Sequence, residues 1–326
     1  METKDKPANQ VLDIEKPAAK DGWICPSTQA FWEESRRTRD HSVFDFLHGY
    51  FYSRWPYLYI GIANGEHPLS PWFTRLVKLV SVFLTSKPET DDGMRGVADK
   101  YHAKVLTSEG AKQLLTVRED IRVENLEQVI PYNHARDIIL KNSDHIVSIE
   151  CPCRSSRANP CTPLDVCLIV GEPFARFIVE HHPQRARWID VEEACYILET
   201  EHARGHVHHA FFNVMMLNRF FGICNCCSCC CTAMQAMRNG TPMLASSGYV
   251  SVVATKLCIG CGDCEARCPF GAMKLVDGIA EVDDQVCMGC GICTSTCEVG
   301  APSLVRDPTK CEPLEIQSLL HQVETR

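Results

Sequence analysis

The sequence predicts an α+β protein in which a cysteine-rich middle domain precedes a smaller domain rich in cysteine and glycine. Three observations lead to this prediction. Mixed helical and strand patterns begin at Tyr101, ten cysteines gather in two runs at 151–167 and 224–231, and from about residue 248 short strands, many glycines and eight regularly placed cysteines follow. A chain of 326 residues is long enough for about two domains of ordinary size.

Composition is ordinary for a globular protein apart from the 21 cysteines, with 45% hydrophobic residues and a formal net charge of −8. No stretch reaches the roughly 18 to 20 uncharged apolar residues that span a bilayer, so we expect no transmembrane segment. The first residues lack the basic and then apolar pattern of a signal peptide. We therefore expect a cytoplasmic protein, whose cysteines are more often metal ligands or redox groups than disulfide partners. The acidic balance argues against binding to nucleic acid.

Changes in composition divide the chain into five segments. Residues 1–22 carry nine charges and little apolar content, which predicts a disordered tail. An aromatic-rich N-terminal region at 23–128 comes next, followed by a cysteine-rich α+β domain at 129–247. The second cysteine-rich domain occupies 248–307, and a C-terminal helix is expected within 308–326.

Aromatic side chains dominate the start of the N-terminal region. Between Trp23 and Phe83 lie 14 of the 26 aromatic residues, which predicts either a packed subdomain or a docking surface. Apolar residues at helical spacing predict a helix over Pro71–Lys87, buried in the fold or, alternatively, lying on a partner or as a peripheral contact on a membrane. The polar residues 88–100 are interpreted as a linker.

Caps and breakers mark the remaining elements. Asp190 and Glu193 resemble a capping box, and Gly205 and Gly240 stand where helices end. One strand is expected to deliver Cys151 to a loop. The predicted elements are a strand at His145–Glu150 and helices at Ser108–Leu115, Tyr132–Lys141, Asp190–His202, around Met234 and Met237, and at Pro313–Val323.

The strongest motif is a duplicated C-x2-C-x2-C-x3-C run. The first copy is Cys258, Cys261, Cys264 and Cys268, followed by Pro269; the second is Cys287, Cys290, Cys293 and Cys297. Close spacing lets three thiolates surround one face of a cubane cluster, while a distant thiolate completes the set. Structural zinc is the alternative, but zinc takes four ligands in two pairs, whereas eight cysteines stand here in two runs of four.

Over about 60 residues this region resembles the bacterial two-cluster ferredoxin domain. In that family the fourth cysteine of each run serves the other cluster. The resemblance implies two [4Fe–4S] clusters, the first held by Cys258, Cys261, Cys264 and Cys297, the second by Cys287, Cys290, Cys293 and Cys268. Gly260, Gly262, Gly289 and Gly291 would let the backbone approach the sulfurs. Glu298 departs from the family, which usually has proline there, and this affects the turn rather than the ligands.

The middle domain holds ten further cysteines in two runs. They are Cys151, Cys153, Cys161 and Cys167, and then Cys224, Cys226, Cys227, Cys229, Cys230 and Cys231. So many thiols predict one or two further Fe–S clusters, with iron bound through these cysteines. Cys161 and Cys167 are expected to close round the same centre as Cys151 and Cys153. Arg154 and Arg157 would offset the negative charge. A structural zinc knot, or one cluster with some buried thiols, is the alternative.

Together the two cysteine-rich segments, from about Ile130 to Pro302, resemble a group of ferredoxin-like proteins of anaerobic bacteria. That resemblance implies electron transfer. A second likeness is weaker: the spacing of Cys195, Cys226 and Cys227, and Cys258 echoes the cysteine-rich repeat of heterodisulfide reductases, which binds a noncubane cluster. The spacing is shorter than in that family, and Cys258 already belongs to the ferredoxin motif.

A histidine cluster and three isolated cysteines complete the candidates. His202, His206, His208 and His209 would suit a mononuclear metal site, but we expect a solvated helix end followed by a strand. Cys195 is expected to be a core thiol. Cys25 and Cys311 have no assignment.

Motifs for organic cofactors are missing from the sequence. There is no Gly-rich dinucleotide loop after a strand, no phosphate-binding P-loop and no nucleophile elbow. We therefore predict an iron–sulfur protein that passes single electrons between redox partners with basic docking surfaces. The alternative is a redox enzyme whose special cluster in the middle domain reduces a disulfide or another small substrate. A third hypothesis is a structural or assembly module that holds zinc.

Overall fold

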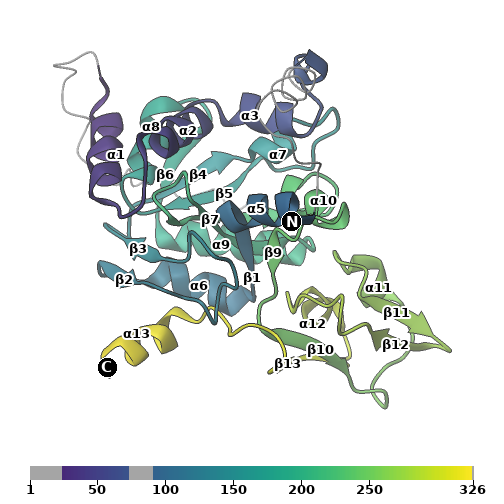
Figure 1. The fold of residues 1–326 in the computed structure, drawn as a ribbon. Helices are drawn as coiled ribbons and strands as arrows, with labels where there is room; N and C mark the ends of the chain where they lie inside the picture. The colour runs from purple at the N-terminus through teal and green to yellow at the C-terminus, as the bar shows by residue number, and fades with distance from the viewer. Residues whose placement is uncertain (1–23, 73–90, 325–326) are drawn as a thin grey trace, which may run out of the picture.

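A seven-stranded sheet forms the centre of the larger body in the computed structural model, which describes residues 24–72 and 91–324 (Figure 1). Its order is β6-β4-β5-β8-β7-β1-β9, antiparallel throughout except for the parallel β1–β9 pair. The strands are β1 Tyr101–Leu106, β4 Ile146–Glu150, β5 Asp165–Val170, β6 Ala186–Ile189, β7 Val207–Asn213, β8 Arg219–Cys226 and β9 Leu244–Ala245.

One face of the sheet packs against the aromatic helices α1 (Pro26–Arg37) and α2 (Val43–Arg54) and against α8 (Phe174–His181). Phe31 lies at the centre of this layer, with ring centroids 5.2 Å from Phe46 and 5.8 Å from Phe177. The chain then adds short helices around the same face: α3 Pro56–Ala63, α5 Asp91–Lys100, α7 Pro152–Ser155 and α10 Thr232–Arg238. Both cysteine runs of the middle domain emerge on this side.

The opposite face is covered by α6 (Ser108–Thr116) and α9 (Val191–Ala203), and α13 (Ile316–Glu324) packs against α6. Its core is aliphatic, with buried residues such as Leu114, Leu198 and Ile223. A small two-stranded sheet of β2 (Ile121–Val123) and β3 (Ile138–Leu140) adjoins this layer. The sheet therefore separates an aliphatic layer from an aromatic layer that contains the thiols.

The C-terminal cysteine-rich region is a separate small lobe at the lower right of Figure 1. Two antiparallel pairs frame it, and two short helices lie between them. Its elements are β10 Tyr249–Val253 with β13 Pro302–Arg306, β11 Met273–Val276 with β12 Ile279–Val282, and the helices α11 Asp263–Arg267 and α12 Ile292–Thr296.

Most predicted elements are confirmed, and the α+β class with them: β4, α6, α9, α10 and α13 lie at the predicted positions to within a few residues. The capping of α9 is one-sided. Asp190 Oδ1 accepts from the Glu193 backbone N–H at 2.7 Å, but the Glu193 side chain binds Arg187 instead of turning back.

Two predicted elements are wrong. Residues of the expected helix Tyr132–Lys141 form β3, because Ala135 adopts a positive φ of 52° and Ile138–Leu140 then bond to β2. The polar segment 88–100 was expected to be a linker, but its described residues, 91–100, are helical. It forms α5, which packs on β1 and buries Ala98, so tertiary contact outweighs its glycines.

The expected boundary at 128/129 falls inside one body. β1 belongs to the aromatic-rich region, yet it is hydrogen-bonded to β7 of the middle region along its whole length. Phe31 and Phe46 are buried against the sheet, but Phe44 of α2 is 83% exposed, so this segment is packed in part and still presents aromatic surface. The tail 1–22 and all but the first two residues of the helix expected at Pro71–Lys87 lie outside the described residues. Within residues 24–72 and 91–324, no helix has the length and apolarity needed to cross a bilayer.

Candidate metal centres

The duplicated cysteine runs adopt the same backbone geometry. Gly262 and Gly291 precede α11 and α12 with the same left-handed conformation, at φ 81° in both. Each short helix ends at the fourth cysteine of its run, where Cys268 and Cys297 turn to extended backbone with ψ of 111° and 112°. The repeat in sequence is therefore a repeat in structure.

Cys268 lies with the cysteines of the other run. It lines a small cavity of about 20 Å³ together with Cys287, Cys290 and Cys293. Cys264 lies near Cys258 and Cys261: burial raises its pKa first, and the charges of the other two thiols add to this. It packs in one small core with Cys268 and Cys293. Cys297 Sγ accepts from the Ala301 N–H at 3.4 Å at the end of α12, which packs against α11.

Backbone amides reach the sulfurs in both halves. Ala280 N donates to Cys258 Sγ at 3.4 Å, and Ser251 N donates to Cys287 Sγ at 3.5 Å. The Ser251 hydroxyl also lies 3.3 Å from Cys293 Sγ. Such donors stabilise thiolate charge and tune the potential of a bound cluster.

Close backbone approach requires glycine within each first C-x2-C turn. A Cβ at Gly260 would meet the Gly278 carbonyl oxygen at 2.4 Å, and one at Gly289 would meet the Tyr249 carbonyl oxygen at 2.3 Å. Both residues also have positive φ, 69° and 66°. The close approach at these two glycines is to backbone carbonyls and not, as expected, to the sulfurs, and an added Cβ at Gly262 would meet nothing within 4 Å.

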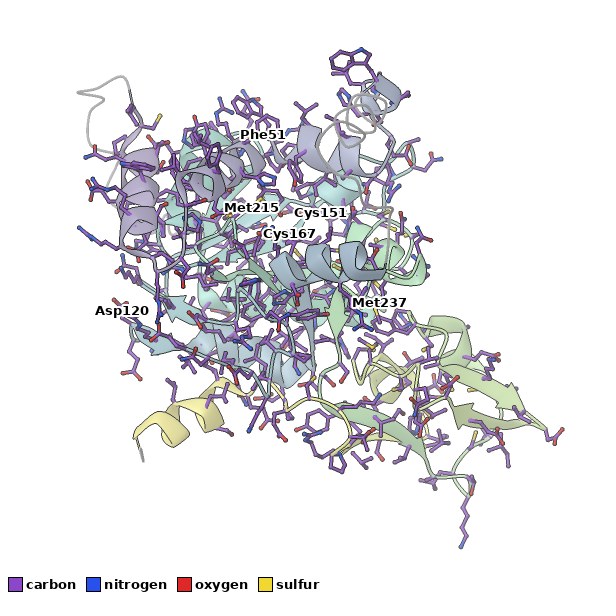
Figure 2. The ribbon with its side chains drawn as sticks, in the orientation of Figure 1. Phe51, Asp120, Cys151, Cys167, Met215 and Met237 are labelled. Atoms are coloured by element: carbon purple, nitrogen blue, oxygen red, sulfur yellow. The ribbon has the colours of Figure 1, made fainter. Side chains whose placement is uncertain are left out.

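The ten middle cysteines separate into two sets. Seven of them line a cavity of about 70 Å³ on the aromatic face of the sheet, beside Tyr52 and Tyr101. One of the seven, Cys227, also has its sulfur within 4.8 Å of those of Cys161, Cys229 and Cys230. The other six we call the chamber thiols. Figure 2 shows Cys151 and Cys167 close together between the sheet and the helices above it. The chamber thiols are Cys151, Cys153, Cys167, Cys224, Cys226 and Cys231.

The chamber thiols form a continuous chain of contacts. Hydrogen bonds with Cys153 and then Cys167 raise the pKa of Cys151. The bond with Cys151, followed by one with Cys231, lowers the pKa of Cys153. Cys224 continues the chain from Cys167 at one end, and Cys226 continues it from Cys231 at the other. Six sulfurs in contact, all free of disulfides, provide more soft ligands than one cubane requires.

His209 stands at one end of this chain. It is fully buried on β7, opposite Cys224 of β8. Neither ring nitrogen meets a nitrogen or oxygen partner among the described residues, and the ring lies against Cys226. The pKa of Cys226 is lowered to about 6, by its bond with Cys231 and, against the effect of burial, by His209. A buried imidazole whose one polar contact is the sulfur of Cys226 fits a metal-binding chamber.

The other four middle cysteines form an outer set at the edge of the chamber. The sulfurs of Cys161, Cys227, Cys229 and Cys230 all lie within 4.8 Å of one another. Cys161 and Cys229 are nearest, at 2.9 Å. The expectation that Cys161 shares a centre with Cys151, Cys153 and Cys167 is therefore not what the structure shows, because the loop carries Cys161 outward to the 227–230 turn.

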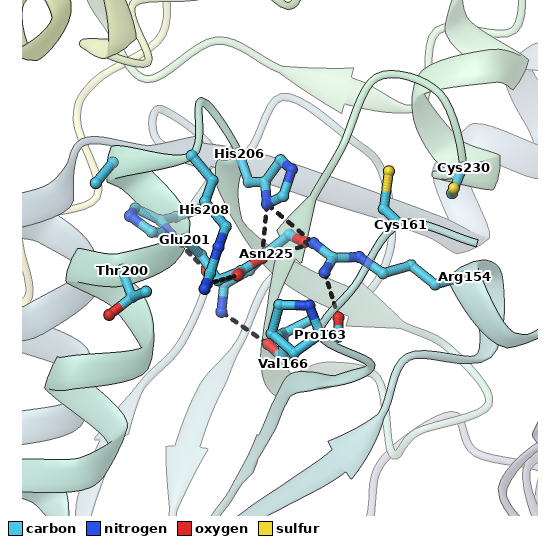
Figure 3. A network of polar contacts seen from close by, with 12 residues as sticks. Arg154, Cys161, Pro163, Val166, Thr200, Glu201, His206, His208, Asn225 and Cys230 are labelled. Carbon is cyan, nitrogen blue, oxygen red and sulfur yellow. Dashed lines mark hydrogen bonds and ion pairs between the residues drawn. The ribbon is translucent and has the colours of Figure 1, made fainter. Parts of the chain in front are cut away.

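Arg154 is buried between the two sets, and Figure 3 shows its network. Its guanidinium pairs with Glu201 at 2.6 Å and donates to the carbonyl oxygens of Pro163 and Asn225. Arg157 likewise pairs with Glu66 at 3.0 Å. Both arginines were expected to offset thiolate charge. For Arg154 this is confirmed in part: burial raises the pKa of Cys227, and the charge of Arg154 acts against that rise. Both arginines also fix the loops that carry cysteines.

The histidine cluster is not a solvated helix end. His206 binds Glu201 at 2.6 Å, and His208 binds Asn225 Oδ1 at 2.6 Å in the buried interior. His208 and His209 do belong to a strand, as expected, but both are buried there. The four histidines do not form one site. His202 of α9 stacks on His208 at 5.5 Å between ring centroids, whereas His209, the next residue of β7, lies on the other face of the sheet.

The isolated cysteines have separate environments. Cys195 is half-buried on α9 rather than in the core. Cys25 directly precedes α1. Cys311 lies 3.0 Å from the ammonium of the buried Lys104, a contact that only tertiary structure reveals. Sequence reasoning also missed Tyr52, Tyr101 and the burial of His209, although the alternation of β7 was a signal for the last.

Comparison with known proteins bears on one part of the chain. Residues 251–298 match the family model described as a 4Fe-4S dicluster domain, and this range contains all eight cysteines of the duplicated runs. No curated protein matches the chain. No solved structure matches it either. The C-terminal lobe of this protein therefore contains a 4Fe-4S ferredoxin-type domain.

Proposed function

We propose that this protein is an iron–sulfur electron carrier with two [4Fe–4S] clusters in its ferredoxin-type domain and a further cluster in the chamber. The observation that carries the proposal is the chamber itself. Six disulfide-free thiols, four of them buried and two half-buried, line one cavity, in the same packed core as Cys290 of the ferredoxin-type domain. Bound clusters would supply one-electron chemistry, cycling between an oxidised and a reduced state.

The ligands in the ferredoxin-type domain are proposed to be crossed between the two runs. Cys258, Cys261, Cys264 and Cys297 would hold the first cluster. Cys268 would join Cys287, Cys290 and Cys293 for the second, which is supported by the cavity that these four line. This is the arrangement of the bacterial two-cluster ferredoxins that the sequence resembles.

An apolar path connects the second ligand set with the chamber. Met288 and Ile292 flank Cys290 and pack in the same core cluster as Met234 of α10, the helix that follows Cys231. Figure 2 shows Met237 of the same helix on the side facing the ferredoxin-type domain. Ser247 fixes this contact, because its backbone N–H donates to the Met288 carbonyl and its hydroxyl to the Gly289 carbonyl. Dry packing of this kind suits electron tunnelling from one centre to the next.

The first ligand set would face the redox partner. Cys261 is exposed, whereas Cys287 and Cys290 are buried toward the body. Ile259 beside it is 71% exposed, and Asp263 and Glu265 of α11 are exposed as well. Residues 248–307 contain eight acidic and four basic side chains, hence a net charge of −4 before any cluster binds. We infer a partner with a basic docking surface, in the reducing cytoplasm that free thiols require.

Two serine substitutions within one run test the crossed ligands. Cys264→Ser should damage the first cluster and Cys268→Ser the second, although both residues belong to the same run. Electron paramagnetic resonance of the reduced, anaerobically purified protein should therefore lose a different signal in each variant. Cys195→Ser, a thiol outside every set, serves as the control. Loss of the same signal in both variants would overturn the crossed assignment.

A specific observation also favours the second candidate, a redox enzyme. Tyr52 and Tyr101 line the chamber with their hydroxyls 3.3 Å apart, and burial raises the pKa of both phenols, so they remain protonated donors. Reduction of a disulfide needs two electrons and two protons and yields two thiols. The ferredoxin-type domain would supply the electrons and the phenols would relay protons. A chamber signal that changes on adding a small disulfide to the reduced protein, and that does not change in Tyr52→Phe, would favour this enzyme.

A further inference from the structure

We propose that the outer set, Cys161, Cys227, Cys229 and Cys230, binds a single zinc ion at the edge of the chamber. This ion would be separate from any cluster that the chamber thiols hold. The inference does not depend on the proposed electron transfer, because its geometry and its ligands are distinct.

The spacing of the four sulfurs fits one ion. A tetrahedral zinc with Zn–S bonds of about 2.3 Å holds its sulfurs about 3.8 Å apart. All four sulfurs here lie within 4.8 Å of one another, and Cys229 and Cys230 are 3.6 Å apart. In a cubane each thiolate binds a different iron, so the four sulfurs stand farther from one another than they do around one ion. Because every pair of the four is this close, the outer set fits a single ion better than a cubane.

The four thiols form one contact group: Cys229 Sγ lies 2.9 Å from Cys161 Sγ and 3.6 Å from Cys230 Sγ. Zinc binds cysteine as thiolate, so the ion would displace the protons that these thiols hold. No disulfide joins Cys161 to Cys229, whose sulfurs are 2.9 Å apart rather than the roughly 2.05 Å of a bond.

Side chains from two elements hold the 227–230 turn in shape. Its carbonyl oxygens accept from three different side chains: Arg238 binds Ser228, Gln235 binds Cys229 at 2.8 Å, and Arg157 binds Cys230 at 3.2 Å. The Cys230 N–H donates to Cys227 Sγ. The turn is thus built before the ion arrives, as a metal-binding knuckle requires.

The ion would join two segments that also carry the chamber thiols. Cys161 lies between Cys153 and Cys167, and the 227–230 turn lies between Cys226 and Cys231. Fixing Cys161 to this turn fixes both walls of the chamber. Zinc suits this role because it has no redox chemistry, and because Cys229 is exposed to solvent, where an oxidation-prone cluster would be least protected.

The test is metal analysis of the full-length protein, purified anaerobically from cells supplied with iron and zinc. We expect about one zinc per chain, and zinc-edge X-ray absorption should show four sulfur neighbours at about 2.3 Å and no iron neighbour. Cys161→Ser and Cys229→Ser should each lose the zinc and keep the iron of the ferredoxin-type domain. Cys195→Ser should keep both metals.

A rescue variant separates ligation from folding. Cys161→His should retain the zinc, with one nitrogen replacing one sulfur in the absorption spectrum, because imidazole is an ordinary zinc ligand. Any of three results would overturn the proposal. The first is zinc that persists in Cys161→Ser. The second is wild-type protein that contains no zinc, together with a loss of about four irons in Cys229→Ser, and the third is a Cys161–Cys229 disulfide found by mass spectrometry. None of these bears on whether the chamber thiols bind a cluster, which their own variants test.

Discussion

Ser251 contacts two of the four thiols that line the small cavity of the ferredoxin-type domain. Its backbone N–H donates to Cys287 Sγ, and its hydroxyl lies 3.3 Å from Cys293 Sγ. The residue is buried on β10, so water cannot replace the hydroxyl. A donor to cluster sulfur stabilises the more negative, reduced state more than the oxidised state.

We expect Ser251→Ala to lower the reduction potential of the second cluster. A hydrogen bond worth about 0.5–1.5 kcal/mol corresponds to roughly 20–65 mV for one electron. Ser303→Ala, an exposed serine of the neighbouring strand β13, should leave the potential unchanged. Redox titration monitored by electron paramagnetic resonance measures both. A potential that rises, or that shifts equally in both variants, would contradict this role for the hydroxyl.

His102 shows how burial links stability to pH. Its ring is fully buried between Tyr132 and Phe212, and desolvation lowers its pKa to about 4, from 6.5 in the unfolded chain. The unfolded state therefore takes up the proton first as the pH falls. Stability is lost progressively below about pH 6.5 and continues to fall until the folded-state pKa near 4 is reached.

His102→Gln should flatten this dependence. Between pH 7 and pH 5 the wild type should lose about 2 kcal/mol more of its unfolding free energy than the variant does. The exposed His134→Gln is the matched control and should behave as the wild type. Unfolding by denaturant under anaerobic conditions, at several pH values, measures the free energy of unfolding of each protein. Identical pH profiles for wild type and His102→Gln would show that the buried ring does not cause the pH dependence of stability.

Sequence could identify the eight cysteines of the ferredoxin-type domain, because their spacing is set by a local requirement to wrap one cluster. It could not sort the ten middle cysteines. Cys151 and Cys161 differ in sequence context only slightly, yet one faces the chamber and the other the outer set. What separates them is the path of a loop anchored by the Arg154–Glu201 pair, a contact between residues 47 positions apart.

At the scale of elements, the two cysteine runs depend on tight turns that only glycine allows. Gly289 has φ of 66°, and an added Cβ would meet Ser247 Oγ and the Tyr249 carbonyl oxygen, both at 2.3 Å. Gly271 has a similar φ of 69°, but nothing lies within 4 Å of an added Cβ. A side chain added at Gly271 would therefore show the cost of backbone strain alone, whereas one added at Gly289 would show strain and a steric clash together.

Gly289→Ala should lose the second cluster, because the clash moves the turn between Cys287 and Cys290. Iron content should fall by about four per chain. Gly271→Ala should keep the iron and cost only about 1 kcal/mol, the penalty for a side chain at left-handed φ. Iron analysis and thermal unfolding test the two variants. Full iron content in Gly289→Ala would show that the turn tolerates displacement.

Elements with complete local signals were predictable, and those decided by distant contacts were not. α9 has Asp190 at its start and Gly205 after its end, so its bounds follow from sequence. β3 has no local strand signal strong enough to outweigh the helical spacing of its neighbours. Its identity depends on pairing with β2, some 15 to 20 residues earlier. α5 contains two glycines and forms because β1 offers a surface for it.

At the scale of the whole molecule, the exposed Cys261 of the first ligand set and the buried Cys287 and Cys290 of the second give the proposed relay a direction. Asp263 and Glu265 lie on α11 beside the exposed Cys261. A basic partner would be steered to this end of the molecule, and electrons would then pass inward by way of the second set to the chamber.

Asp263→Asn combined with Glu265→Gln should slow association with a basic partner. At low ionic strength we expect a decrease of roughly two- to tenfold, which disappears at high salt. The control is Asp144→Asn with Glu192→Gln, the same charge change at exposed positions of the body. Stopped-flow reduction of a basic c-type cytochrome by the reduced protein measures the rate. Equal slowing by both double variants would place the docking surface elsewhere.

The central claim is that the chamber thiols hold an iron–sulfur cluster in addition to those of the ferredoxin-type domain. The most direct measurement is iron and sulfide content with Mössbauer spectra, on full-length wild type and on Cys151→Ser/Cys167→Ser, both purified anaerobically. We expect about twelve irons in the wild type and about eight in the variant, with the ferredoxin signals unchanged. About eight irons in both proteins, with the same Mössbauer spectrum, would contradict it.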